Sequence, residues 1–177
     1  MADRITIDAI AAEYRRYQGL GEGAMSQMSD AELVAPAPGD ANSAATIVWH
    51  LAGNFQSRFT DFLTSDGEKP WRKRDEEFDL RMASRAEILR RWNEGWTVLF
   101  ATLAGLDDTQ LDRSVSIRAQ PLSVREALLR SVTHTSYHVG QMVLLARGCR
   151  GAAWKSLSIP RGQSQAYNQA PTRERSM

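Results

Sequence analysis

The chain has 177 residues, 42% of them hydrophobic and 24% charged, which argues against a disordered protein and is enough for one well-packed domain. The formal net charge of +1 argues against the strongly basic surface of a nucleic-acid-binding protein. No stretch approaches the ~18 consecutive apolar residues of a membrane span, and the single cysteine, Cys149, excludes an internal disulfide framework. Since MADRITIDAI carries no secretory signal, we expect a cytoplasmic protein without nucleic-acid or membrane partners.

The first predicted helix covers residues 6–28, where side chains recur at three- and four-residue spacing. The stripe consists of Ile10, Tyr14, Tyr17, Gly21, Ala24 and Met28. Three nearby glycines would each cost about 1 kcal/mol relative to alanine. Either a neighbouring backbone therefore approaches closely there, or the helix is irregular. Two prolines and a glycine in VAPAPGDAN then break the chain.

The second predicted helix begins at Ser43, a suitable N-cap, and runs to about Ser65. Asp66 and Gly67 end it, and Pro70 prevents its continuation. Its apolar stripe consists of Val48, Leu51, Phe55, Phe59, Phe62 and Leu63.

A charged segment, EKPWRKRDEEF, follows this helix. We expect a solvated loop with Trp71 and Phe78 packed onto the body of the protein. Arg58 and the arginines of this loop have two interpretations. One is that they bind a carboxylate of a thiol cofactor. The other is that they are solvated surface groups, which is more common for arginine.

The third predicted helix begins at Ser84, where Glu87 gives a capping-box pattern, and Gly105 ends it. Its buried side consists of Ile88, Trp92, Trp96, Leu99 and Leu103. Tryptophans at this spacing are typical of core packing.

Residues 113–122 alternate with the period of a strand and predict a short β-hairpin before the last helix. Val115 and Ile117 fall on one side of it, and the turn is expected near Gln120 and Pro121.

The last predicted helix starts with a second capping box at Ser123, runs to Arg147 and closes at Gly148. Four long amphipathic helices predict an all-α protein, a four-helix bundle. We expect a single domain over residues 1–168, followed by a disordered tail at 169–177.

The three histidines are the candidate functional residues. His134 and His138 are four residues apart, so on a helix they point the same way. His50 lies on the second helix, with polar neighbours beside the apolar stripe. Metal sites in helical bundles are built from side chains on facing helices, and three neutral imidazoles leave a position open for water or substrate. The pattern favours a site for one divalent metal ion.

Simpler interpretations exist for the same residues. A single histidine on a half-apolar helix face is usually a core residue with a hydrogen-bond partner. Asp61 and Glu13 are the candidates for a fourth ligand. Asn54 and Gln141 would either orient the imidazoles as second-shell partners or make interhelical hydrogen bonds.

Three stretches of the chain resemble the DinB/YfiT-like superfamily, and in particular a branch known only as a domain of unknown function. They are HTSYHVGQMV, the block from WHLAGNF to RKRDEEF, and LSIPRG, within a resemblance that covers about residues 10–168. The resemblance implies a four-helix bundle, often a homodimer, with a histidine triad that binds nickel or zinc. The ligand positions of that triad fall on His50, His134 and His138.

The resemblance also implies a class of chemistry, because some relatives are thiol-dependent transferases or isomerases that use bacillithiol, mycothiol or glutathione. A metal ion lowers the pKa of a bound thiol, and the thiolate is the nucleophile. We therefore expect a small-molecule substrate and a metal-dependent transfer of a small thiol to an electrophile. Two alternatives stay open, which are a metal-dependent hydrolase at the same site and a non-catalytic dimeric metal-binding bundle.

Overall fold

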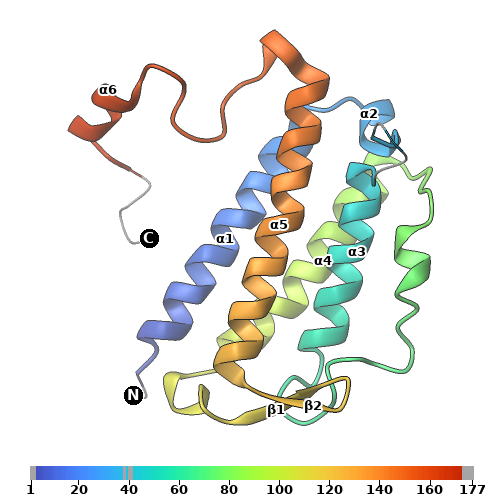
Figure 1. The fold of residues 1–177 in the computed structure, drawn as a ribbon, viewed down its shortest axis with the longest axis vertical. Helices are drawn as coiled ribbons and strands as arrows, with labels where there is room; N and C mark the ends of the chain where they lie inside the picture. Colours follow the sequence, from blue (N-terminus) through green and yellow to red (C-terminus); the bar gives the residue numbers. More distant parts are fainter. Residues whose placement is uncertain (1–2, 38, 40–41, 173–177) are drawn as a thin grey trace.

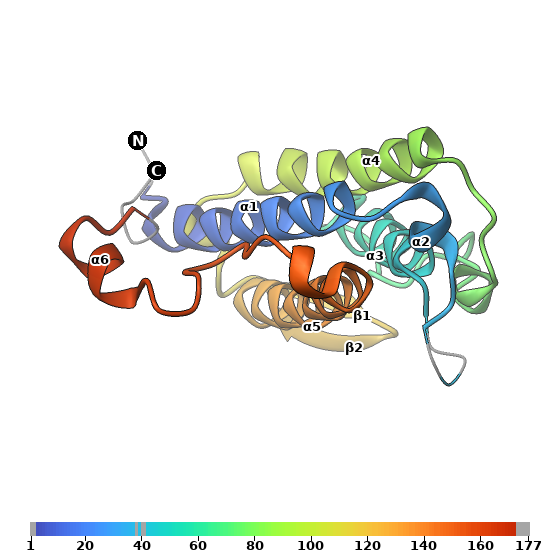
Figure 2. The ribbon, with the colours of Figure 1, turned by 90° about the horizontal axis from the view of Figure 1, so that it is seen from above.

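The computed structural model describes residues 3–37, 39 and 42–172. Within these residues the chain is mostly helical, with a small two-stranded antiparallel sheet. Four long helices lie side by side (Figures 1 and 2). They are α1 (Ile5–Ser26), α3 (Ala44–Phe59), α4 (Arg85–Ala104) and α5 (Val124–Arg150). None of the described helices is both long and apolar enough to cross a membrane.

The long helices share one apolar core. α3 packs mainly against α4, and α1 packs mainly against α5. Tyr14 meets Phe55 and Trp96 edge-to-face in the middle of this core. Gly21 has a packing reason, because an added Cβ would lie 2.7 Å from Cζ2 of Trp92. The glycines therefore do not interrupt α1, and a tryptophan side chain, not a backbone, makes the close approach.

Serine side chains start three of the long helices, as predicted. Ser43, Ser84 and Ser123 each accept a hydrogen bond from a backbone N–H in the first turn. At Ser123 the capping box with Glu126 is complete. The sequence interpretation missed the short helix α2 (Asp30–Val34), which is capped in the same way by Ser29.

Two predicted helix ends were wrong. α3 ends at Phe59 and not at Ser65, because Asp61 adopts a left-handed backbone with φ of 49°. The Asp61 carbonyl then accepts hydrogen bonds from the backbone N–H groups of Thr64 and Ser65. α5 passes Gly148 and ends at Arg150, since the left-handed residue that closes it is Gly151, with φ of 52°.

The segment after α5 leaves the four long helices (Figure 1). It ends in α6 (Ser164–Gln169), so helix extends one residue into the predicted disordered tail. Most of that tail, residues 173–177, lies outside the described residues. The prediction of a single domain over residues 1–168 stays a prediction.

The predicted hairpin is present, as β1 (Ser114–Ile117) and β2 (Gln120–Ser123). Its turn is not at Gln120 and Pro121, because Pro121 lies within β2 and pairs with Ser116. The turn residues are Arg118 and Ala119, with φ of 56° and 57°. These residue types rarely adopt a left-handed backbone.

The carboxylate of Asp66 stabilises this turn. It accepts hydrogen bonds from the backbone N–H groups of Arg118 and Ala119 at 2.8 and 2.7 Å, and from the Ser116 hydroxyl at 2.6 Å. Asp66 follows α3 in the chain, so this contact attaches the hairpin to the end of α3. Val115 and Ile117, predicted to fall on one side of the hairpin, both pack against the core.

Candidate metal centre

The three histidines of the chain converge between α3 and α5. Nε2 of His50 lies 3.0 Å from Nε2 of His134. The ring of His138 lies 4.7 Å from that of His50 and 4.6 Å from that of His134, measured between centroids. One ring nitrogen from each residue can be chosen so that all three lie within 4.8 Å of one another. The four-residue spacing on α5 produces this arrangement, because both side chains project from one face.

The cluster is buried, and the imidazoles of His134 and His138 are neutral at pH 7. His50 and His138 are buried and His134 is half-buried. Burial, together with the neighbouring imidazoles, lowers the pKa of His134 to about 3. Burial and His50 lower the pKa of His138 to about 4. Neutral imidazoles have a free lone pair, which is the form that binds a metal ion.

A carboxylate that sequence reasoning missed, Glu77, holds His50 in place. Its Oε2 lies 2.9 Å from Nδ1 of His50. Arg72 donates to both carboxylate oxygens of Glu77, at 2.8 and 2.9 Å. Burial opposes the charge, but the hydrogen bonds from His50 and Arg72 prevail and lower the pKa of Glu77. A charged Glu77 requires a donor at Nδ1 of His50, so Nε2 is the nitrogen of this ring that faces the other histidines and can bind a metal ion.

The expectation of a solvated loop after α3 is right for most of its residues and for the packing of Phe78, but Arg72 and Glu77 face inward and form a wall of the site. The Arg72 side chain is only 2% exposed, and the Phe78 ring lies 4.6 Å from that of His50. Trp71, expected to pack inward, is 54% exposed. The loop thus buries an ion pair and exposes a tryptophan, the reverse of what composition favours.

Gly53 is the sequence signal that could have revealed Glu77. It lies one turn after His50 on α3, and an ideal Cβ there would lie 2.8 Å from Cδ of Glu77 and closer to an oxygen. Only glycine leaves room for the carboxylate at that position. A glycine inside an otherwise good helix often marks such a close approach.

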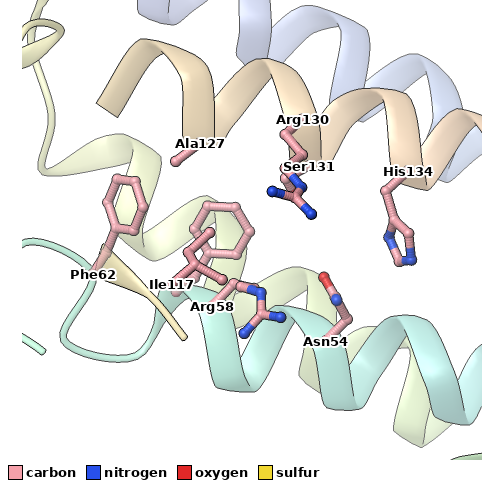
Figure 3. A pocket seen from close by; sticks show the side chains of 9 residues that line it. Asn54, Arg58, Phe62, Ile117, Ala127, Arg130, Ser131 and His134 are labelled. Atoms are coloured by element: carbon pink, nitrogen blue, oxygen red, sulfur yellow. The ribbon is translucent and has the colours of Figure 1, made fainter. Parts of the chain in front are cut away.

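Of the two residues expected to orient the imidazoles, Gln141 contacts a histidine and Asn54 lines a cavity. Oε1 of Gln141 lies 3.0 Å from Nδ1 of His138, so the amide can fix the tautomer of that ring. Asn54 lines a cavity beside His134 (Figure 3).

Neither candidate for a fourth ligand lies in the cluster. Glu13 pairs with Arg16 on the exposed side of α1, with 2.6 Å between charged atoms, and Asp61 is exposed in the turn after α3. Among the described residues, the group that could hold a metal at this position consists of the three histidines. Cys149 is exposed near the end of α5.

The donor set fits a divalent ion with an open coordination position. Zinc–nitrogen bonds of 2.0–2.1 Å in a tetrahedron place two ligand nitrogens about 3.3 Å apart. The 3.0 Å between Nε2 of His50 and Nε2 of His134 is close to that value. Two of the three imidazoles also have a hydrogen-bond partner at Nδ1, from Glu77 and Gln141. Such partners are typical of histidines that bind metals through Nε2.

Comparison with known proteins gives a family but no activity. No curated protein and no solved structure matches the chain. The model of one family, described as "Protein of unknown function (DUF1572)", matches residues 3–163. This match includes all four long helices and the three histidines. The chain therefore belongs to the DUF1572 family, and its histidine cluster lies within the part that defines the family.

Proposed function

We propose that this protein is a DinB/YfiT-like four-helix-bundle enzyme that binds one divalent ion, zinc or nickel, through His50, His134 and His138. The observation that supports it best is the convergence of three buried imidazoles from two helices, with the Nε2 atoms of His50 and His134 facing each other. Two neutral lone pairs at that distance repel each other unless a proton or a cation lies between them.

We further propose that the site transfers a small thiol to an electrophile. A bound dication would lower the pKa of the thiol so that it reacts as thiolate. The residues of the chain orient the ligands, through the Glu77 contact to His50 and the Gln141 contact to His138. A hydrolase would also need a base beside the attacking water. Glu77 is not free for that role, since His50 and Arg72 engage both of its oxygens.

Metal content tests the site directly. Protein purified without a histidine tag should carry about one divalent ion per chain, and a His138→Ala variant should lose most of it, because two ligands hold an ion far more weakly than three. Ser136→Ala is the matched control, since Ser136 lies on the same helix and its hydroxyl donates to the Thr133 carbonyl and not to a histidine. If wild type and His138→Ala have the same sub-stoichiometric metal content, the proposal is wrong.

Thiol binding tests the chemistry. The cobalt-loaded protein should develop a sulfur-to-metal charge-transfer band with bacillithiol, mycothiol or glutathione, because a thiolate would occupy the open position. If no thiol perturbs the spectrum while ester or amide substrates turn over, the protein is a hydrolase. If neither occurs, it is a non-catalytic metal-binding protein.

A further inference from the structure

A small cavity lies beside the histidine cluster, between α3, α5 and the hairpin (Figure 3). Its volume is about 90 Å³. One side is apolar, with Phe59, Phe62 and Ile117. The other side is polar, and His134 belongs to both the cavity and the cluster. A molecule in this cavity would therefore touch the candidate metal centre with one end.

Two arginines reach into the same space from opposite helices. The guanidinium groups of Arg58, on α3, and Arg130, on α5, point toward one another across the cavity (Figure 3). Like charges that face each other are unfavourable unless an anion lies between them.

The charges around the cavity do not balance. Arg58 donates to the Gly67 carbonyl and, at 3.1 Å, to Glu68, but Arg118 also binds Glu68, at 2.9 Å. The side chain of Arg130 makes no hydrogen bond or ion pair within the part of the chain that the structure describes. Glu77 is used by Arg72. The cavity is thus positive before any metal ion adds its own charge.

We propose that this cavity binds the carboxylate of a small ligand between Arg58 and Arg130, with the apolar part of the ligand against Phe62 and Ile117. Guanidinium groups match a carboxylate by their planar fork of donors. A volume of about 90 Å³ admits only a small group, so the bound part has a few non-hydrogen atoms. The role of this subsite in positioning a reactant beside the metal rests on the proposed function.

Butyrate and its neutral analogue butyramide are suitable probes. The isoleucine methyl signals of the full-length protein, as purified, are followed by NMR, and Ile117 is assigned with an Ile117→Val variant. Butyrate should shift the Ile117 signal in a saturable way, and butyramide should bind at least tenfold more weakly, because it cannot form charged pairs.

Arg130→Gln should weaken butyrate binding at least fivefold. Arg125→Gln is the matched control, because Arg125 is also exposed on α5 but pairs with Asp112, and it should change the affinity less than twofold. Equal binding of butyrate and butyramide, no binding of either, or equal effects of the two substitutions would overturn the proposal.

The carboxylate could belong to the electrophile or to the thiol. The charge-transfer band of glutathione in the cobalt-loaded protein distinguishes the two. If butyrate suppresses this band competitively, the cavity binds the carboxylate of the thiol. If the band persists while butyrate is bound, the cavity binds the carboxylate of the electrophile. Metal content is measured on the same samples. If the protein carries metal but does not bind butyrate, the subsite alone is rejected. If it binds butyrate but carries no metal, the proposed function alone is rejected.

Discussion

At the scale of single residues, we predict that the charge of Glu77 determines how well His50 binds a metal ion. Glu77→Gln keeps the shape of the side chain but removes the charge that holds the Nδ1 proton and pairs with Arg72. Loss of such an outer partner typically costs 10–100-fold in metal affinity. We expect a loss in that range, measured by competition with a chromophoric chelator. Glu76→Gln, an exposed neighbour, should leave the affinity unchanged, and equal affinities of both variants would reject the role of Glu77.

A substitution at Gly53 tests the contact between Glu77 and His50 independently. Gly53→Ala places a methyl group where the Glu77 carboxylate lies, so the loop that carries Glu77 must move away from His50. We expect weaker metal binding and an unfolding free energy lower by about 1–3 kcal/mol, the usual effect of overpacking. Gly140→Ala on α5 meets no atom within 4 Å and should be neutral or slightly stabilising. Chelator competition and urea unfolding of the two variants would reveal the difference.

At the scale of elements, the hairpin depends on Asp66. Its hydrogen bonds to Ser116 and to the backbone of the turn lower its pKa below the usual value of 3.8. A lowered pKa in the folded state stabilises the fold above pH 3.8, and this contribution disappears as the pH falls through the folded-state pKa.

Asp66→Asn should therefore lower the unfolding free energy by about 1–2 kcal/mol at pH 7, where the charged hydrogen bonds are present. The difference from wild type should shrink as the pH falls below about 4, because the wild-type carboxylate is then protonated increasingly in the unfolded state. Urea unfolding at several pH values measures this. Asp112→Asn, whose side chain is 90% exposed, is the control and should change little. A difference that is constant with pH would contradict the assignment.

Helix positions were predictable from the sequence, whereas several helix ends and the loop were not. The apolar spacing of α4 reflects one buried face, and a local pattern is enough to reveal it. The end of α3 depends on one left-handed residue, Asp61, of a type that tolerates but does not require that backbone. The three histidines were found because they lie on predicted helices. Glu77 was not, because the path of an irregular loop brings it to His50.

At the scale of the whole molecule, the exposed side of α5 suggests how the predicted homodimer forms. Leu129, Tyr137 and Leu144 are exposed and lie seven or eight residues apart, hence on one face. Wild-type protein at micromolar concentration should have twice the chain mass of 19.8 kDa in light scattering. Leu144→Glu should give monomers, because it places a charge in an apolar contact.

Leu80→Glu is the matched control, since Leu80 is similarly exposed but lies in the loop before α4. This variant should remain dimeric. A monomeric wild type would reject the dimer, and a dimeric Leu144→Glu variant would place the interface on another face.

The pairing of the helices has a consequence for how the molecule opens. α3 belongs to one closely packed pair with α4, and α5 belongs to the other with α1. The histidines lie on both sides of the boundary between these pairs. An ion held by all three would therefore act as a cross-link between two cooperative units of local unfolding. Backbone amides of α3 and α5 would then exchange their hydrogens together in the loaded protein, and separately once the ion is removed.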